Sequence, residues 1–497
     1  AAVFHDEIGN WSSPLPQAPT TAFQPGLDAA IKAAASDVDP RYLDEVFVAS
    51  ATAHRVSAFF HTHVHPEDGA PFEEGVRFSF DPSTWEQLDR QEITGPEVEG
   101  GNRPGDLARF LVDLHVRLYL PNPWGLLLTG VLGLAMMVAA VTGVVIHRQM
   151  IRDLFLQRLS RKNRVLSARD RHVAAGTWNL VFTFLLAFTG SFFSFAGSFG
   201  LPVMAMVASG GDQEKLFEMV IGLPEAHDDS PAPVADLDAL LVDARSRSTG
   251  EGSQPQFLVV SRWGQADGFA MVTMSPPAGD LKVNTLMYQA DSGEFMRAKP
   301  NIGLQPSLGD DVLSLIGPLH FGNFAGLFSK AVWFGLGFAS SYVVLTGLLL
   351  WTQRREHHRG WQRLRRLSVW MGYGLLFALA ATPVGFFSAE WLGFAQDYAV
   401  KLAFVLGVVI ASLMMLVIRD MAQLTQALVA GFAGLLIVAV ALRWFSGGMG
   451  WLAAARAGWP EIPAVDLLFL ATGGGIIVWQ AYRSVNQPQL APAGQNQ

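Results

Sequence analysis

The sequence predicts a mainly α-helical, polytopic membrane protein that carries two small α+β modules outside the membrane. Three observations predict this fold class. Of the 497 residues, 50% are hydrophobic and 16% are charged, whereas a soluble domain has roughly 25% charged residues. Seven apolar stretches are long enough to cross the hydrocarbon at ~1.5 Å per residue. Two long regions between them carry alternating, strand-like sequence instead.

The apolar stretches define the predicted helix bundle. They are residues 123–146, 173–199, 325–351, 367–391, 398–418, 422–445 and 464–482. Basic residues concentrate at 148–171 and 353–366, and the positive-inside rule places both loops in the cytoplasm. Alternation then places 1–122 and 200–324 outside and the C-terminus inside. The first residues read as the exit from a span, so we expect one further helix before them.

The predicted organisation has five parts. They are an extracytoplasmic module with its approach to the membrane (1–122), a helix pair (123–199), a second extracytoplasmic module (200–324), a second helix pair (325–391) and additional C-terminal spans (392–497). In each module a predicted helix, at 27–36 or 234–247, precedes the strands. The strand-like segments are 45–65, 75–80, 256–262, 268–274 and 283–289, with turns at 81–84 and 291–293.

Composition excludes several kinds of site. The chain has no Cys, which rules out disulfides, thiolate zinc sites, iron–sulfur clusters and covalently attached c-type haem. Any metal or haem must be held by His, Met or carboxylates. The formal net charge of −8 argues against a nucleic-acid partner.

The spans carry a repeated Thr-Gly step. Thr142-Gly143 and Thr346-Gly347 occur in the first and third spans, and Thr189-Gly190 occurs in the second. His115 precedes Thr142 by 27 residues and His320 precedes Thr346 by 26, so a histidine belongs to the same repeat. A small residue at a fixed depth lets a flat ligand or another helix approach the backbone closely.

Four of the 12 histidines lie at the ends of spans. They are His115 and His320 on the outside, and His147 and His172 on the inside. Ionisable side chains at such depths are costly and indicate function. Without Cys, opposed histidines on neighbouring helices are the natural axial ligands for b-type haem. Arg117, Arg148 and Arg171 are candidates to pair with haem propionates. The alternative is that these histidines only form hydrogen bonds among the lipid headgroups.

A second histidine group lies in the first module. His61, His63 and His65 alternate along a predicted strand, which would place all three on one face. Three imidazoles at this spacing can bind Zn²⁺ or Cu²⁺. The alternative is a solvated strand end that runs into Pro66.

Five motifs occur in a fixed order along the first 355 residues. They read FHDEI at 4–8, TGVVIHR at 142–148, DRHVAAG at 170–176, LHFGNF at 319–324 and TGLLLW at 346–351. In these motifs the sequence resembles the PepSY-associated transmembrane-helix family. The resemblance implies a bacterial inner-membrane protein with periplasmic PepSY modules, related to proteins that reduce ferric siderophores in the periplasm with membrane haem.

The resemblance also implies a set of ligands and partners. It assigns His115 and His320 to an outer haem b, and His147 and His172 to an inner one. A histidine on the expected first helix would displace His147 or His172. The substrate would be a ferric siderophore or another ferric chelate. Electrons would come from quinol or another redox protein, because no cytoplasmic segment is long enough for a flavin or nicotinamide domain.

Two other classes of function remain open from the sequence. One is a non-enzymatic PepSY protein that binds peptide or restrains a protease. The other is a permease that moves a siderophore or metal through the additional spans. The sequence favours the reductase, because a plain anchor does not need histidines at both membrane faces. In every case the basic loops contact membrane lipid.

Overall fold

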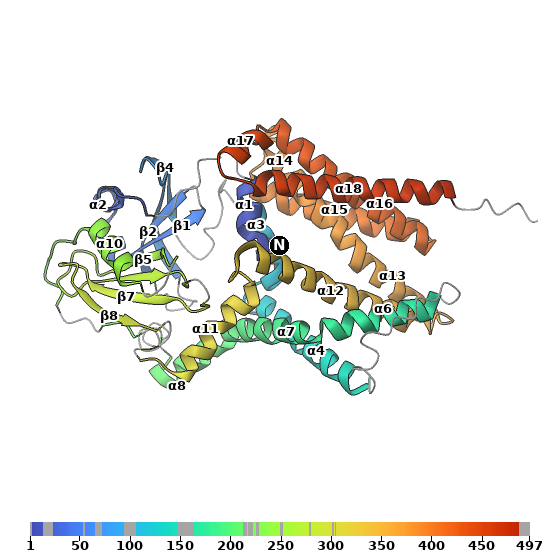
Figure 1. Ribbon diagram of the computed structural model, residues 1–497, viewed down its shortest axis with the longest axis horizontal. Helices are drawn as coiled ribbons and strands as arrows, with labels where there is room; N and C mark the ends of the chain where they lie inside the picture. The colour runs from blue at the N-terminus through green and yellow to red at the C-terminus, as the bar shows by residue number, and fades with distance from the viewer. Residues whose placement is uncertain are drawn as a thin grey trace, which may run out of the picture.

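The structure is a computed structural model that describes residues 2–12, 23–52, 55–64, 72–93, 106–146, 164–211, 216, 222–224, 228–248, 252–277, 280–300, 303 and 305–486. Figure 1 shows a β-sheet with two short helices at one end and a bundle of long helices beside it. The chain enters the sheet twice and returns to the bundle each time.

Seven helical segments of the described chain are long and apolar enough to cross a membrane, which confirms the predicted number of spans. They are Trp124–Ile146 (α4), Leu180–Ser209 (α7, Leu180–Phe195, and α8, Leu201–Ser209), Gly326–Gln353 (α12), Arg359–Ala389 (α13, Arg359–Val369, and most of α14, Leu375–Leu392), Gln396–Val417 (α15), Met421–Phe445 (α16) and Glu461–Val485 (most of α18, Glu461–Asn486). Short helices flank them: α1 (His5–Ser12), α3 (Asp106–Arg117), α6 (Arg164–Trp178), α11 (Leu308–Phe321) and α17 (Trp451–Arg456).

The second span differs from its prediction, 173–199, at both ends. Helix α6 stops before the buried Asn179, whose amide nitrogen donates to Thr183 Oγ1 (3.1 Å) and to Ser340 Oγ of α12 (2.6 Å). At the other end the apolar sequence continues as α8 to Ser209. A π-turn, Ala196–Gly200, ends two residues before Pro202. Proline has no backbone N–H, and a local π-turn adjusts the helical hydrogen bonds around it.

The strands form one antiparallel sheet in the order β4-β3-β2-β1-β5-β6-β7-β8. They are β1 (Glu45–Thr52), β2 (Arg55–Val64), β3 (Phe72–Phe80), β4 (Gln87–Ile93), β5 (Pro255–Ser261), β6 (Phe269–Met274), β7 (Asn284–Gln289) and β8 (Phe295–Lys299). The two halves, far apart in sequence, join where β1 pairs with β5, with Val46 opposite Val260.

Some strand predictions need correction. The segment 45–65 is two strands, β1 and β2, which fold back on each other as a pair. The outer strands β4 and β8 were not predicted, because an edge strand can be polar and lacks the apolar alternation of a buried one. The turn at 81–84 is confirmed, with Ser83 N donating to Asp81 Oδ1 (2.8 Å). The turn at 291–293 is also confirmed, and Gly293 supplies its positive φ of 72°.

Two helices cover one face of the sheet. They are α2 (Leu27–Ala35) and α10 (Leu237–Arg247), and their apolar residues belong to one core cluster with strands from both halves. The helices also cap each other: Gly26 N donates to Asp238 Oδ2 (2.9 Å), and Leu237 N donates to Asp28 Oδ1 (3.0 Å). The two helix-and-strand units therefore share one core.

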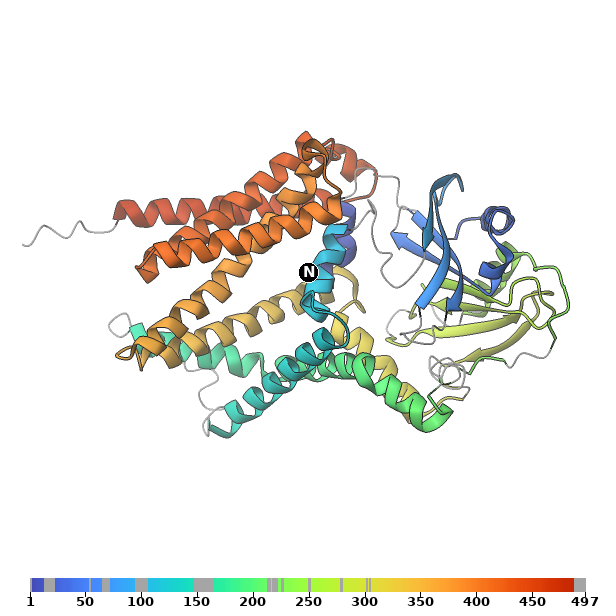
Figure 2. The ribbon, with the colours of Figure 1, turned by 180° about the vertical axis from the view of Figure 1, so that it is seen from behind.

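The long helices form two groups, visible from behind in Figure 2. Helices α14, α15, α16 and α18 form one group, and α4, α6, α7 and α12 form the other. Helix α1 connects the groups. On one side its Glu7 Oε1 accepts from Lys330 Nζ of α12 (2.7 Å). On the other side its Asn10 Nδ2 donates to Glu461 Oε1 of α18 (3.0 Å).

A fully buried carboxylate anchors this connection. Asp466 of α18 accepts hydrogen bonds from three indoles, those of Trp11 (2.8 Å), Trp444 (3.1 Å) and Trp451 (2.7 Å). It also pairs with the buried Arg443 of α16, whose Nε lies 3.0 Å from Oδ1. Three indoles and the guanidinium all donate to the carboxylate, and such additional hydrogen bonds are the condition under which a buried ion pair is stable.

We expect Asp466→Asn to destabilise the protein by about 3–5 kcal/mol, because it leaves the Arg443 charge buried without its partner. Asp397→Asn is the matched control. It removes the more exposed pair with Lys401, which should cost only about 0–1 kcal/mol. Thermal unfolding of the detergent-solubilised protein compares the two. Equal shifts in melting temperature would show that the buried pair adds nothing special.

Candidate functional site

Two of the predicted histidines are held by threonines of the Thr-Gly repeat. His320, at the end of α11, places Nδ1 2.9 Å from Thr189 Oγ1 of α7. His172 of α6 places Nδ1 3.0 Å from Thr346 Oγ1 of α12. In each case the imidazole and the threonine come from different helices, so the contact also positions two helices.

The glycine of each step makes room for the ring. A Cβ added at Gly190 would come within 3.3 Å of His320 Cε1, and one at Gly347 within 3.1 Å of His172 Cε1. Both contacts are tighter than ordinary van der Waals contact. The Thr-Gly step therefore supplies a hydrogen-bond partner and the space beside it.

The threonines determine which ring nitrogen is free. Thr189 donates to Leu185 O (2.8 Å) and Thr346 donates to Tyr342 O (2.7 Å), each within its own helix. Because a hydroxyl has one proton, each oxygen faces its imidazole with lone pairs. An Nδ1–H that donates to this oxygen would leave Nε2 with the lone pair with which imidazole binds a metal.

His115 of α3 and His320 of α11 lie close together on one side of the bundle. Their ring centres are 6.3 Å apart and their planes are inclined by 37°. A metal–imidazole bond of about 2 Å plus half a ring on each side gives roughly 6 Å for two imidazoles that bind one metal from opposite sides. The observed separation therefore suits an iron between them. Phe193 and Phe321 pack edge-on against His320, with ring centres 5.4 and 5.3 Å away.

The surroundings keep both of these imidazoles neutral. Helices α3 and α11 lie outside the seven spans. Desolvation, with a contribution from neighbouring His115, lowers the pKa of His320 to about 4, and desolvation also lowers the pKa of His115. A neutral ring is the form that ligates iron, so near neutral pH neither ring has to lose a proton first.

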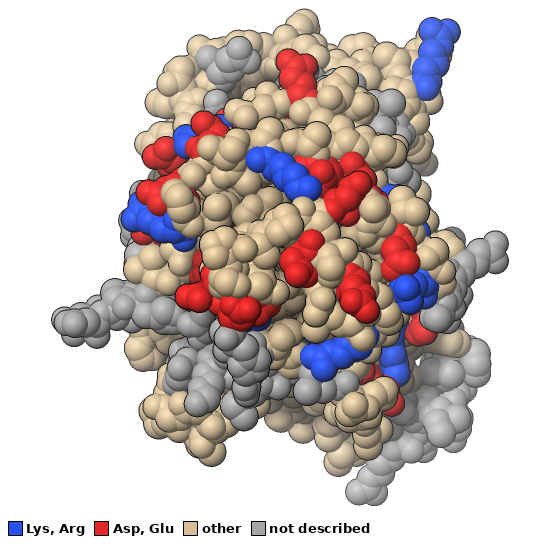
Figure 3. Space-filling view, turned by 90° about the vertical axis from the view of Figure 1, so that its left-hand side faces the viewer, with Lys and Arg blue, Asp and Glu red and all other residues tan. Residues whose placement is uncertain are grey.

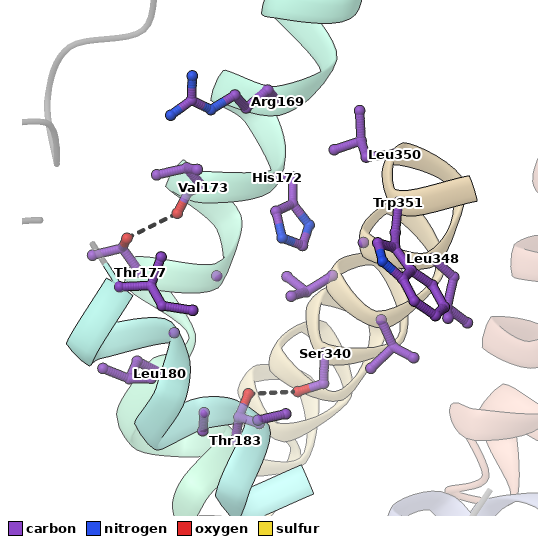
Figure 4. Close-up of a pocket in the computed structure, with 18 of the residues that line it drawn as sticks. Arg169, His172, Val173, Thr177, Leu180, Thr183, Ser340, Leu348, Leu350 and Trp351 are labelled. Carbon is purple, nitrogen blue, oxygen red and sulfur yellow. Dashed lines mark hydrogen bonds between the residues drawn. The ribbon is translucent and has the colours of Figure 1, made fainter. Parts of the chain in front are cut away.

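A cavity of about 780 Å³ lies beside His172, between α4, α6, α7 and α12. Cofactor sites typically have volumes of ~300–1,000 Å³. Figure 4 shows His172 pointing into it from α6, with Leu348 and Trp351 of α12 on the other side. Three glycines line it, Gly143, Gly176 and Gly347. This space is mainly apolar, has glycines in its walls and has an imidazole at its edge, which are features that a flat, apolar ligand requires.

Arginines line this cavity, but they are not the predicted ones. They are Arg169, one turn before His172 on α6, and Arg354 and Arg355, just after α12. Of the predicted arginines, Arg171 is exposed and is not among the lining residues. Arg117 pairs with Asp113 on its own helix (3.2 Å). Predicted His147 and Arg148 lie outside the described residues.

The third Thr-Gly step, Thr142-Gly143, also reaches the cavity through Gly143. Thr142 Oγ1 donates to Val138 O of its own helix (2.8 Å), as the other two threonines do. Among the described residues no imidazole accompanies it, and a Cβ at Gly143 would meet open space. Like the other two steps, it combines a threonine whose proton is used within its own helix with a glycine next to it.

The two imidazole sites are well separated. His172 and Thr189, which holds His320, are 17 residues apart in the chain (172 to 189). At ~1.5 Å per residue this is roughly 25 Å, against a hydrocarbon thickness of ~30 Å. One cofactor cannot contact both sites. The structure therefore brings His115 and His320 together and keeps His172 apart from them.

The sheet carries the other predicted histidine group. His61 and His63 lie on the same face of β2, with ring centres 5.3 Å apart. Predicted His65 lies outside the described residues. Glu73 of β3 was not predicted and joins the two histidines, because the strand register places it opposite His63.

Comparisons with known proteins agree with the motifs. Residues 1–354 match the family described as the PepSY-associated TM region. An uncharacterized protein of Pseudomonas aeruginosa is 27% identical over 399 residues, which cover 76% of this chain and 96% of that protein. The family match ends directly after α12, so the last four spans lie beyond it. The chain is a membrane protein that belongs to the PepSY-associated TM region family.

Proposed function

We propose that this protein is a transmembrane b-type cytochrome with two haems. It would pass electrons across the bacterial inner membrane and reduce a ferric siderophore or another ferric chelate in the periplasm. The observation that carries the proposal is the His115–His320 pair. Its 6.3 Å ring separation, with the Nδ1 of His320 held by Thr189, suits two axial ligands of one iron.

The residues of this chain would hold two haems in different ways. His115 and His320 offer a pair of neutral imidazoles for an outer haem. His172 offers one imidazole in a cavity that is lined by three glycines and by arginines that suit propionates. Its second ligand would be His147, which lies outside the described residues. Bound between imidazoles, haem supplies reversible one-electron transfer.

The site requires little other chemistry from the protein. Electron transfer to a chelate needs close approach and no acid, base or nucleophile. Hard oxygen donors hold Fe(III) better than Fe(II), so reduction would loosen the chelate. The sheet with its shared core stands at one end of the bundle in Figures 1 and 2, and we assign that end to the periplasm. Quinol or another redox protein would supply the electrons.

The outer pair is tested by removing its ligands. His115→Ala and His320→Ala should each lower bound haem from about two to about one per chain, and the double variant should lose no more, because both residues hold one unit. Thr189→Val should weaken the same haem, whereas Thr189→Ser keeps the hydroxyl and should not. His358→Ala is the control outside the site. Different spectral losses that sum in the double variant would refute the pairing.

The direction of electron flow is tested in oriented proteoliposomes. The protein is reduced beforehand, and a membrane-impermeant ferric chelate is added to one side. We expect reoxidation when the chelate meets the sheet end, and none when it meets the Arg-rich loops. His320→Ala should abolish it. Reoxidation from the Arg-rich side alone would overturn the proposal.

A further inference from the structure

Two histidines and a glutamate converge on the sheet face opposite α2 and α10. His61 and His63 alternate along β2, and Glu73 of β3 stands opposite His63. Candidate ligand atoms of the three residues all lie within 4.8 Å of one another. We propose that these side chains bind a divalent transition-metal ion. This inference does not rest on the proposed electron transfer.

His61 is the buried member of the group. Its side chain is 3% exposed, and its ring stacks on Phe59 with centres 4.4 Å and planes 6° apart. Its Nδ1 lies 3.4 Å from Phe59 O, a contact in which Nδ1 donates and Nε2 keeps its lone pair. Metal-ligating imidazoles are commonly oriented in this way by a backbone carbonyl.

The strand across from His61 comes very close to it. The paired residue is Gly75, and a Cβ there would lie 1.9 Å from Phe60 O and 2.9 Å from His61 Cβ. A larger residue would crowd the position where the imidazole stands. Without one, Glu73, two residues before Gly75, reaches the same place as the two rings.

A fourth side chain completes the group. Glu45 of β1 places Oε1 3.5 Å from His61 Nε2, so an ion at Nε2 would lie within its reach. An ion pair between His61 and Glu45 would account for that contact alone. It would not account for His63 and Glu73 converging on the same point. Two neutral imidazoles with two carboxylates carry a charge of about −2, which a divalent cation neutralises.

The donor set limits which ion fits. Two imidazole nitrogens with carboxylate oxygens are typical of zinc and of non-haem ferrous iron, whereas Mg²⁺ and Ca²⁺ prefer oxygen ligands alone. The long-range field also favours a cation. Figure 3 shows acidic side chains spread over the end of the molecule that the sheet forms, with fewer basic ones among them.

The test is Zn²⁺ binding to the full-length protein in detergent, by equilibrium dialysis with metal quantification. Zn²⁺ is redox-inert, so it does not react with haem. We expect one equivalent of bound Zn²⁺ that excess Mg²⁺ does not displace, because Mg²⁺ prefers oxygen ligands alone. His63→Ala and Glu73→Gln are exposed positions that should fold normally, and each should lose this equivalent. His358→Ala and Glu86→Gln are matched controls that should retain it.

Two results would overturn the site. One is wild-type protein that binds no such equivalent, which would leave the His61–Glu45 ion pair as the whole explanation. The other is His63→Ala and Glu73→Gln binding Zn²⁺ as wild type does. Haem content is measured in the same samples. Zn²⁺ bound by a protein without haem would refute the proposed cytochrome and leave the metal site standing.

Discussion

The hydrogen bond from an imidazole Nδ1 to the threonine of a Thr-Gly step is the interaction on which the arrangement of the candidate site depends. It occurs at His320 with Thr189 and at His172 with Thr346. Inside a bilayer, polar groups must be satisfied by the protein itself. The threonine meets this need for Nδ1 while its own proton goes to its helix, and the glycine beside it admits the ring. The second ring nitrogen, Nε2, is then the one that would bind a metal at each site.

The rest of the fold holds these nitrogens in place. Helix α1 ties α12 to the additional spans through Glu7–Lys330 and through the buried Asp466 cluster. Helices α3 and α11 bring His115 and His320 to the same side of the bundle, directly beside the end that carries the sheet. Because the two halves of the sheet share one core, the chain must leave and re-enter the bundle twice, and each return delivers one of these histidines.

The sequence alone predicted the structural features that hydropathy and the alternation of apolar residues determine. Seven spans, both sheet helices and the common face of His61 and His63 follow from such local patterns. The joining of both strand sets into one sheet and the place of Glu73 depend on strand register between distant segments. The same limit applies to the arginines. Arg169 stands one turn before His172, and this spacing is visible in the sequence. That Arg169 lines the cavity is visible only in the structure, because α12 forms the other side of that cavity. Arg117 was a candidate to pair with a propionate. Its partner in the structure is Asp113, and the spacing of four residues on one helix already indicated that ion pair.

A reduced-minus-oxidised absorption spectrum of the purified full-length protein, with haem counted per chain, decides whether the protein is a dihaem cytochrome. We expect the bands of low-spin b-type haem at about two haems per chain, because imidazoles at two separate sites suit histidine-ligated iron. A count near one would refute the two-site arrangement. Protein that folds and carries no haem would refute the proposed cytochrome.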